Sequence, residues 1–558
     1  MKQTAGLTTL QHFTLSAKKG VPYDLYYRGS RILPSKNGIV IDRGGVLDLG
    51  TYFNLFSWDK WSLYTGLESL SLIVDVKGSC VVTIHSLDEN AKVLEESVTT
   101  ILSRGEFELE VPERLFAGKL AVQIEAKSPC MLISATWSSA KLPFKHSSRI
   151  AAVFCTFNRD EYLFENLNVL KDAGMDNLDV LIVDNASRIE QSKIAELGDG
   201  FHLFHNPNVG GSGGFTRGIM EALKSRENYS HVLLMDDDIR IEAETVRRSG
   251  VLLSCLKPEY DNHFLSGGMM QLDKPHMMFE STARWNGMRV KNYYRDLDLT
   301  ELENLCSSDQ DIKANNKYAA WWYCAIPLKK DTDTQLPFPF FIYGDDMDYS
   351  LKRASGFITM NGIAVWHEPF TKKFSPLFKS YFFCRNTLIL NSLHHRKFSV
   401  LNSLVNAWSH FYVQIFVHDY RSASLALDAF DDFLEGAEYI TALNEQELLK
   451  DKNMPTDFKK RSRDELKNTY RIPASFRRWY SPWYFLHGKL AVYSHDEVQA
   501  EIRSRNWKEI IILTLRFWKL NLSGLYRYYP ASRSYRNLQR STTFWQNRLD
   551  TAQGLQSV

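Results

Sequence analysis

The middle of the sequence repeats one rhythm four times: a short apolar run, a polar turn, and then a stretch with helical spacing. The runs lie in residues 149–159, 178–187, 201–211 and 231–238. Such an alternation of buried strands and helices is typical of a parallel α/β sheet. Each run ends in polar residues, and ligands bind outside the carboxyl ends of the strands in these sheets. We therefore expect the four ends to converge on one crevice.

The fourth run, HVLLMDDD, ends in Asp236, Asp237 and Asp238. Carboxylates that are crowded beside apolar residues repel one another and lose hydration, so a cation or the hydroxyls of a ligand usually compensate them. The alternative is a solvated acidic turn that caps the following helix, because Asp is favoured at N-caps. The cluster therefore indicates a cation site, and the acidic and histidine residues elsewhere in the chain bear on the choice between the two interpretations.

A second acidic cluster consists of Asp345, Asp346 and Asp348. We interpret the aromatic run before it as a strand and the residues after it as an amphipathic helix. His367 ends a further apolar run, GIAVWH. Two acidic clusters in one α/β domain suit a division of labour, in which one set holds a metal and the other supplies a general base. His367 is then a candidate third metal ligand, against the alternative of a structural histidine.

The glycine-rich segment NVGGSGGFTRG, residues 208–218, does not match G-x-G-x-x-G in register and has no Walker lysine. A phosphate cradle of either type is therefore not expected. We expect Gly210 and the glycines after it to let the backbone approach a ligand or the neighbouring aspartate loop, with a helix over Thr216–Leu223. A merely flexible turn is the alternative.

Residues 1–145 read as short alternating strands separated by Gly, Ser, Asn and Pro, which predicts an antiparallel β-sandwich or barrel. We expect Trp58, Trp61 and Tyr64 to pack in its core or at its edge rather than to bind sugar. After residue 395 apolar residues recur at three- and four-residue spacing, as in helices. The expected fold class is therefore α/β, with a β-sandwich at 1–145, a Rossmann-like catalytic domain at 146–395 and a helical region at 396–558.

The composition narrows the class of protein. A chain of 558 residues that is 44% hydrophobic has enough apolar surface for several folded cores. Its seven cysteines form no C-x-x-C pair, so neither a disulfide framework nor a zinc site is indicated, and a reducing cytoplasm is expected. No apolar run is long enough to span a bilayer, so we expect no integral membrane protein.

Basic charge is concentrated at the C-terminal end, where residues 451–558 hold 20 Lys and Arg against 9 Asp and Glu. Aromatic residues accompany this charge in 471–490 and again in 516–536. One interpretation is peripheral docking on the inner face of the cytoplasmic membrane. The other is helix packing or a homo-oligomer interface, where Trp, Tyr and Arg are also enriched. No nucleic-acid partner is expected.

Seven motifs together resemble those of the bacterial galactofuranosyltransferases that use UDP-galactofuranose, an inverting glycosyltransferase family with the GT-A fold. The motifs are FCTFNR, VDNAS, NPNVGGSGGFTRG, MDDDI, WWYCAIP, FFIYGDDMDYSLKR and WHEPF, and they cover about 150–370. The domain order, a sandwich before the GT-A domain and helices after it, is also similar. The resemblance implies transfer of galactofuranose to a saccharide acceptor. It also implies that this acceptor is lipid-linked and that the reaction belongs to cell-surface polysaccharide biosynthesis.

The resemblance also implies roles for individual residues. The general base would be Asp346. Gly344 stands where the family is expected to have a bulky aromatic residue, so the acceptor side of the pocket would be wider or differ in specificity. The implied sets are Asp236, Asp238 and His367 for Mn²⁺ or Mg²⁺; Thr156, Arg159, Asp184, Asn208, Gly210 and Asp237 for the donor; and Glu280, Trp321, Trp322 and Asp345 for the acceptor.

Three other functions remain open on the sequence. The first is a family 2 transferase that moves another sugar. The second is a non-catalytic carbohydrate-binding or scaffold protein, in which the N-terminal sandwich binds. The third is a nucleotidyltransferase, which also uses paired aspartates on an α/β sheet.

Overall fold

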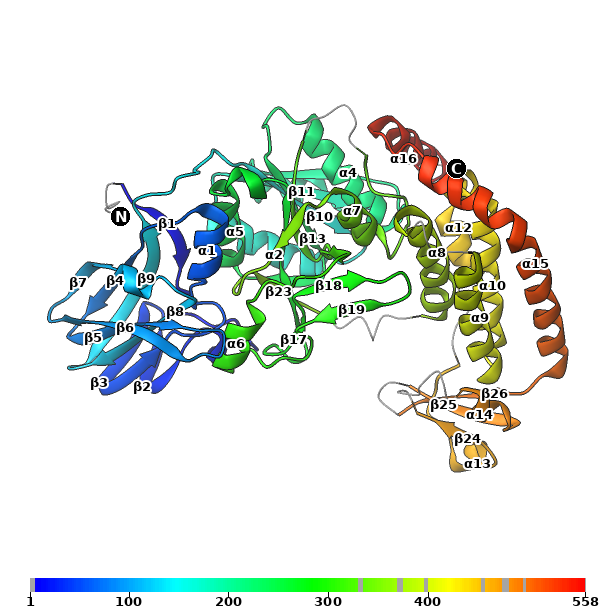
Figure 1. Ribbon diagram of the computed structural model, residues 1–558, viewed down its shortest axis with the longest axis horizontal. Coiled ribbons are helices and arrows are strands. Elements are labelled where there is room, and N and C mark those ends of the chain that lie inside the picture. The colour runs from blue at the N-terminus through cyan, green and yellow to red at the C-terminus, as the bar shows by residue number, and fades with distance from the viewer. Residues whose placement is uncertain are drawn as a thin grey trace.

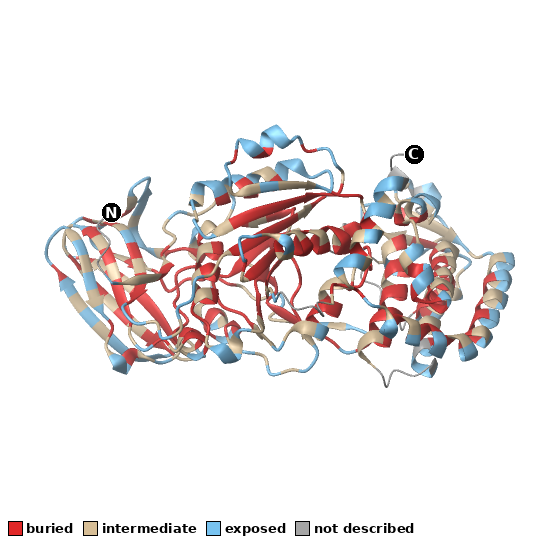
Figure 2. Ribbon diagram, turned by 90° about the horizontal axis from the view of Figure 1, so that it is seen from above, coloured by how far each residue is buried: buried red, intermediate tan, exposed pale blue. Residues whose placement is uncertain are grey.

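The computed structural model describes residues 6–329, 335–368, 375–395, 400–452, 457–473, 481–494 and 498–556. Three regions follow one another along the long axis of the molecule: strands at the N-terminal end, a mixed α/β centre, and helices at the C-terminal end (Figure 1). Buried residues run through the central sheet and into the regions on either side of it (Figure 2).

The N-terminal region is one nine-stranded antiparallel sheet that folds over on itself, with β6 and β7 at the two ends of the strand order. Strand β3 pairs with β9 near its start and with β8 near its end, so it joins two halves of the sheet. The side chains of Cys80 on β5 and Cys130 on β9 are both buried although these strands are not neighbours, as expected where two halves of a sheet pack face to face. The predicted sandwich is confirmed, and Trp58, Trp61 and Tyr64 are buried in it. Its strands are β1 Thr8–His12, β2 Arg28–Ser35, β3 Gly38–Asp48, β4 Ser71–Lys77, β5 Cys80–Leu87, β6 Val93–Ile101, β7 Gly105–Glu110, β8 Lys119–Ala126 and β9 Cys130–Ser139, with helix α1 Trp58–Thr65.

The central region contains a seven-stranded sheet in the order β12-β11-β10-β13-β21-β15-β22. The four predicted runs form its parallel half, with β10 between β11 and β13. Their carboxyl ends therefore lie at one edge, as expected for a ligand crevice. The elements are β10 Ile150–Thr156, α2 Asp160–Ala173, β11 Leu178–Asp184, α3 Gln191–Ala195, β12 Phe201–His205, α4 Gly210–Lys224, β13 His231–Asp236, α5 Ala243–Ser254, β15 His263–Ser266, α6 Leu302–Ser308, β21 Tyr323–Pro327, α7 Asp345–Arg353 and β22 Gly356–Ile358.

Helix α4 begins at Gly210, six residues earlier than the sequence predicted. Two of its glycines allow the helix to pack closely against strand β10. A Cβ atom on Gly214 would lie 2.1 Å from the sulfur of Cys155, and one on Gly218 would lie 2.2 Å from a methyl carbon of Val153. Both contacts are on β10, so only glycine lets the helix lie this close to the strand. A flexible turn is therefore excluded.

The aromatic run before the second acidic cluster is not a strand, contrary to our prediction. Residues 335–344, all of which the structure describes, form no regular element. Pro337 and Pro339 lack the N–H groups that a central strand needs, and Phe341 and Tyr343 have positive φ angles of 69° and 66°. The chain turns sharply there and enters α7 directly, with the three aspartates in its first turn.

A second sheet in the order β14-β23-β16-β17 lies beside the crevice. Its strand β14 pairs with β23 so that Ile239 lies opposite His367, which brings the histidine to the end of the Asp236–Asp238 run. A small third sheet, β19-β18-β20, completes the region. These strands are β14 Ile239–Ile241, β16 Gly268–Gln271, β17 Met278–Glu280, β18 Thr282–Trp285, β19 Val290–Tyr293, β20 Lys317–Tyr318 and β23 Ala364–His367.

The C-terminal region is a helical bundle that begins before residue 395. Helix α8 packs on α10 and α15, so the predicted domain boundary at 395 separates two helices of one bundle. A short sheet, β24-β25-β26, was missed because strands of three to five residues carry little sequence pattern. The elements are the π-helix Phe378–Phe382, α8 Phe383–His394, α9 Val400–Phe416, α10 Tyr420–Glu435, α11 Ala437–Ala442, α12 Glu445–Lys452, α13 Arg463–Leu466, β24 Tyr470–Ile472, α14 Ser481–Phe485, β25 Lys489–Tyr493, β26 Ala500–Ser504, α15 Trp507–Asn537 and α16 Thr542–Gln556.

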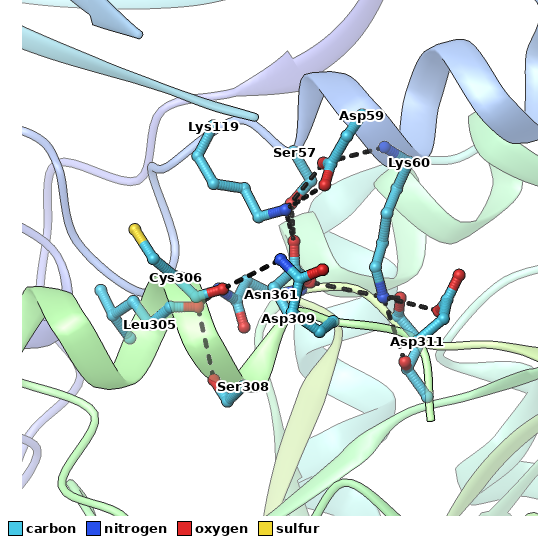
Figure 3. A network of polar contacts seen from close by, with 12 residues as sticks. Ser57, Asp59, Lys60, Lys119, Leu305, Cys306, Ser308, Asp309, Asp311 and Asn361 are labelled. Atoms are coloured by element: carbon cyan, nitrogen blue, oxygen red, sulfur yellow. Dashed lines mark hydrogen bonds and ion pairs between the residues drawn. The ribbon is translucent and has the colours of Figure 1, made fainter. Parts of the chain in front are cut away.

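A buried ionic network joins the sandwich to the catalytic region (Figure 3). The carboxylate of Asp309 lies 3.1 Å from the Nζ of Lys119 and 3.7 Å from that of Lys60, and the side chains of all three are at most 4% exposed. Asp309 also accepts hydrogen bonds from the hydroxyl of Ser57 and the backbone N–H of Asn361. The two lysines belong to the sandwich, and Asp309 belongs to the catalytic region. Separating the two domains would leave these buried charges without partners, which would cost free energy.

We expect Asp309→Ala to lower the free energy of unfolding by about 3 to 5 kcal/mol, because two buried ammonium groups lose their shared carboxylate. Burial, the largest single effect, raises the pKa of Asp309, but Lys119, Lys60 and the hydrogen bonds together lower it below its ordinary value. The contribution of Asp309 is therefore present above the unfolded pKa and is lost as the pH falls through the folded one. Denaturant unfolding at several pH values measures both effects.

The matched control is Asp311→Ala, because Asp311 contacts the same Lys60 but its side chain is 35% exposed. Its replacement should cost only about 1 kcal/mol or less. Equal losses of stability for the two variants would contradict a latch centred on Asp309.

Candidate functional site

Three predicted metal ligands lie together at the carboxyl end of β13. The candidate ligand atoms of Asp236, Asp238 and His367 all lie within 4.8 Å of one another. The Nε2 of His367 is 3.1 Å from a carboxylate oxygen of Asp238 and 3.7 Å from one of Asp236. Its Nδ1 lies 2.6 Å from the carbonyl oxygen of Glu368, and a hydrogen bond donated there leaves Nε2 as the lone-pair nitrogen facing the aspartates.

This donor set fits a divalent cation. Two carboxylates and one neutral imidazole suit Mn²⁺, and carboxylate oxygens also suit Mg²⁺. The hydrogen bond from Nδ1 of His367 to the carbonyl oxygen of Glu368 orients the imidazole ring, as such bonds do for histidine ligands in metal sites. Among the described residues, Asp236, Asp238 and His367 form a group of three potential ligands that could all bind one ion.

Asp237, between the two candidate ligands, points to the first strand of the crevice. One of its oxygens accepts hydrogen bonds from the hydroxyl of Thr156 at 2.9 Å and the backbone N–H of Phe157 at 3.3 Å. Arg159 lies 3.3 Å from its other oxygen and 2.6 Å from Asp238. Burial, the largest effect, raises the pKa of Asp237, and Arg159 opposes that shift. Three of the predicted donor residues thus form one connected group beside the metal ligands.

The other predicted donor residues shape the neighbouring strand ends. Asp184 is buried, and its carboxylate accepts hydrogen bonds from the backbone N–H groups of Ala186, Arg188 and Ile189, so it fixes the loop after β11. The side chain of Asn208 accepts a hydrogen bond from the N–H of Gly210 at 3.2 Å. These residues hold the backbone of the crevice edge.

Gly210 has a structural requirement of its own. Its φ is +78°, and a Cβ atom there would lie 1.9 Å from the carbonyl oxygen of Phe341. The glycine segment therefore approaches the loop before α7, which is the close approach to the aspartate loop that the sequence predicted.

Asp345 and Asp346 start α7 and face the first acidic cluster. Removal from bulk water, the largest effect, raises the pKa of Asp346 well above its ordinary value, and Asp345, Glu280 and Asp236 raise it further. The pKa of Asp345 is raised by the same burial and by Asp236. The carboxylates of both clusters therefore act on one another. A raised pKa makes a carboxylate a stronger proton acceptor, as a general base requires.

Asp348, the third acid of the cluster, has a different environment. It is fully buried, and its oxygens lie 2.8 Å from the Nε2 of His394 and in contact with the guanidinium of Arg540. It also accepts the backbone N–H of Phe338 at 3.1 Å. Burial is the largest effect and raises the pKa of Asp348, but Arg540 and His394 outweigh it and lower the pKa below its ordinary value. Asp348 therefore anchors α7 and is not available as a base.

The loop before α7 is held from the C-terminal bundle. The side-chain amide of Asn386 on α8 donates to the carbonyl oxygens of Ile342 at 2.7 Å and Tyr343 at 2.9 Å. Gly344, the N-cap of α7, has a φ of +108°, and a Cβ atom there would lie 3.2 Å from Leu390. Glycine at 344 is therefore required by the backbone, which gives a reason for the missing aromatic side chain.

The predicted acceptor residues separate into two groups. Glu280 is buried, and burial raises its pKa to about 8, while Arg295 opposes the shift. It lies near enough to raise the pKa of Asp346. Trp322 donates from its indole N–H to the carbonyl oxygen of Gly267 at 3.0 Å. Trp321 packs edge-on against Phe215, and both tryptophans are buried, so their place near the acceptor stays a prediction. Adjacent residues point to opposite sides of the chain, and sequence motifs do not say which side faces the crevice.

Sequence reasoning missed several residues that build the site. Asn185 donates to the carbonyl oxygen of Gly210, and Asn206 donates to Asn185; both lie inside the quoted motifs. Asn386, His394 and Arg540 lie outside those motifs and far from the site along the chain. No local pattern identifies these three, because their partners are set by tertiary packing.

Two protein families match parts of the chain. Residues 27–140 match the family described as "Galactofuranosyltransferase 2 N-terminal", and residues 151–248 match "Glycosyl transferase family 2". These segments lie in the sandwich and in the parallel half of the central sheet, where the crevice is formed.

Two relatives are galactofuranosyltransferases named GlfT2. The protein of Mycolicibacterium smegmatis is 25% identical over 444 residues, which cover 74% of this chain and 68% of the relative. That of Mycobacterium tuberculosis is 27% identical over 448 residues, which cover 74% of this chain and 69% of the relative.

Solved structures give weaker similarity. For S. aureus TarS the TM-score is 0.30 at 14% identity, over 51% of this chain and 49% of TarS. For the mannosyltransferase PcManGT from Pyrobaculum calidifontis, in complex with GDP-Man and Mn²⁺, the TM-score is 0.24 at 13% identity, over 55% of this chain and 81% of PcManGT. At these scores neither match supports a conclusion about function.

The grouping of Asp236, Asp238 and His367, the two matched families and the two relatives lead to one conclusion. The chain is a glycosyltransferase with a family 2 domain, and it resembles the bacterial galactofuranosyltransferases in both its N-terminal sandwich and its catalytic region.

Proposed function

We propose that the chain transfers galactofuranose, with inversion, from UDP-galactofuranose to a hydroxyl of a saccharide acceptor. The single observation that carries the proposal is the meeting of Asp236, Asp238 and His367 with the acids of α7 in one crevice. The choice of sugar is supported by the similarity to relatives that are named galactofuranosyltransferases. A lipid-linked acceptor of cell-surface polysaccharide synthesis is part of the same proposal.

Each group in the crevice has a role in this reaction. A divalent ion held by Asp236, Asp238 and His367 would neutralise charge on the diphosphate of the donor. Arg159 and Asp237 would orient the nucleotide beside them. Asp346 would accept the proton of the attacking hydroxyl, since its raised pKa favours protonation as the new bond forms. Glu280 and Asp345 would lie around the acceptor.

The alternatives are tested by the choice of substrate. A family 2 transferase for another sugar would consume a different UDP or dTDP sugar in a donor hydrolysis assay. A nucleotidyltransferase would release pyrophosphate. Incubation of the protein with UDP-galactofuranose, Mn²⁺ and a panel of galactosyl acceptors, followed by mass spectrometry, tests the proposal directly; an unchanged mass for every acceptor would contradict it.

We expect Asp346→Asn to reduce transfer by about 10² to 10⁴, the usual cost of losing a general base. UDP binding should remain within about twofold of the wild type, because the change removes a proton acceptor and leaves the donor contacts in place. Single-turnover transfer and UDP titration measure the two quantities. Transfer should also fall with decreasing pH as the carboxylate becomes protonated.

The matched controls are the other aspartates of α7. Asp345→Asn should have the smaller effect on transfer. Asp348→Asn should lower thermal stability instead, since Arg540 loses a buried partner. If Asp345→Asn were the more damaging change and Asp346→Asn mild, the base would be the wrong member of the pair.

We expect His367→Ala to weaken Mn²⁺ binding by at least about tenfold, because the imidazole supplies one of three clustered ligands. Electron paramagnetic resonance of free Mn²⁺ measures the affinity independently of activity. His205→Ala is the control, because His205 is half exposed at the end of β12 and lies outside the cluster. Unchanged Mn²⁺ affinity in the His367 variant, or full activity in excess chelator, would contradict the metal role.

We also propose that α15 docks the enzyme on an anionic membrane surface. An apolar stripe runs along its outer face at three- and four-residue spacing, over about 33 Å of helix. The stripe consists of Trp507, Ile511, Leu515, Trp518, Leu522, Leu525, Tyr526 and Tyr529, each 48% or more exposed. Among the described residues, no helix combines the length and apolar content that crossing a membrane requires.

Charge favours a membrane surface over a second copy of the chain. Helix α15 holds six Lys and Arg residues and one acid, Glu509. A second copy would bring the same positive charge to the interface, whereas anionic lipid compensates it. In the basic and aromatic segment 471–490, Lys489 and Trp483 are exposed and Tyr484 is buried, while Arg477, Arg478, Trp479 and Tyr480 lie outside the described residues.

We expect Leu515→Ser with Leu522→Ser to weaken binding to anionic vesicles by about tenfold or more, because each leucine contributes apolar burial. High salt should weaken the binding of the wild type. Flotation measures binding, with Leu33→Ser and Leu102→Ser in the distant sandwich as the control pair. Absence of vesicle binding at low salt, with a dimer seen by light scattering, would favour the oligomer instead.

A further inference from the structure

A cavity of about 620 Å³ lies beside the crevice, between the catalytic region and the C-terminal helices. Its size is within the range of ligand pockets. Three segments line it: the turn after β12, the connection from α11 into α12, and one face of α16. The lining residues are Asn208, Val209, Thr441, Ala442, Leu443, Asn444, Glu445, Gln446, Glu447, Lys450, Phe544, Asn547, Arg548, Thr551 and Ala552.

The cavity shares a wall with the donor edge of the crevice. Asn208 lines the cavity, and its side chain caps the N–H of Gly210, the first residue of α4. Its carbonyl oxygen lies 3.5 Å from the side-chain amide of Gln446 on the opposite wall. The cavity is therefore at the carboxyl end of the parallel sheet, where ligands of this architecture bind. Among the lining residues, only Asn208 belongs to the predicted donor set.

The wall of the cavity contains a buried cationic side chain with an unused donor. The side chain of Arg548 is 8% exposed, and its terminal nitrogens contact Glu445 and the carbonyl oxygen of Thr441. Its Nε has no hydrogen-bond partner within the described parts of the chain. Because its terminal nitrogens are paired and its Nε is enclosed by protein atoms, Arg548 fixes the cavity wall and offers no free charge to a ligand.

The charges of the lining cancel. Glu445 and Glu447 stand against Lys450 and Arg548, so an anionic nucleotide finds no excess of positive charge there. Four amide side chains line the cavity, and their remaining donors and acceptors can bind hydroxyl groups, which an acyl chain lacks. The ring of Phe544 offers an apolar face. This combination suits a neutral ligand with many hydroxyls and apolar C–H faces.

We propose that this cavity binds a short stretch of glycan chain. The choice of a glycan over a peptide rests on the proposed transfer to a saccharide acceptor, because the cavity adjoins the donor edge through Asn208. A chain held there is anchored at the end of the crevice formed by α4, while another part of it reaches the reacting groups near α7.

The test measures glycan binding to the full chain without donor or metal. The probes are methyl glycosides of galactofuranosyl, galactopyranosyl and glucosyl tetrasaccharides, followed by saturation-transfer NMR and calorimetry. Asn547→Trp fills the cavity from an exposed position on α16. Thr543→Trp is the matched control on the same helix, because Thr543 is exposed and does not line the cavity.

We expect the wild type to bind at least one of the tetrasaccharides and Asn547→Trp to bind it at least about tenfold more weakly. Thr543→Trp should stay within about twofold of the wild type. In transfer assays the cavity variant should raise the KM for a tetrasaccharide acceptor and leave kcat for a monosaccharide acceptor unchanged.

Three results would overturn the proposal: binding of none of the three probes, equal binding by wild type and Asn547→Trp, or weakening of UDP binding in place of glycan binding. The binding assay needs no transfer reaction. Loss of glycan affinity in the cavity variant therefore supports the glycan site even if no galactofuranose is transferred. Normal transfer with unchanged glycan binding refutes the glycan site and leaves the proposed transfer reaction intact.

Discussion

The buried carboxylate of Asp348 is the interaction on which the candidate site depends. It joins three elements that are far apart in the sequence: α7, the bundle helix α8 through His394, and the segment before α16 through Arg540. A buried charge that lost these partners would destabilise the fold by several kcal/mol, so the three elements are held as a unit. The position of Asp346, two residues earlier in the same helical turn, follows from this anchor.

The same principle explains why so many acids can share one crevice. Asp237 and Asp238 are partly compensated by Arg159, and Asp348 by Arg540 and His394. Asp236 remains close enough to Asp346 that its charge raises the pKa of Asp346. Such an arrangement stores unfavourable charge that a cation at Asp236, Asp238 and His367 would relieve.

The C-terminal helices are part of the site rather than an appendage. Asn386 on α8 holds the backbone of the loop before α7, and the indole of Trp545 on α16 donates to the carbonyl oxygen of Pro337 in that loop. The same helix forms one wall of the cavity at Asn208. On the other side, the Asp309 network fixes the sandwich to the catalytic region (Figure 3). The central sheet is therefore constrained from both ends.

The sequence by itself determined the parallel strands, the sandwich and the grouping of Asp236, Asp238 and His367, because apolar periodicity and strand-end chemistry are local properties. It misread the run before α7, where Phe341, Tyr343 and Gly344 have positive φ angles that apolar composition does not reveal. Only the tertiary structure decided which aspartate of α7 is anchored and which faces the crevice. The reason is physical: that choice depends on Arg540 and His394, whose separation from Asp348 along the chain leaves no local pattern to recognise.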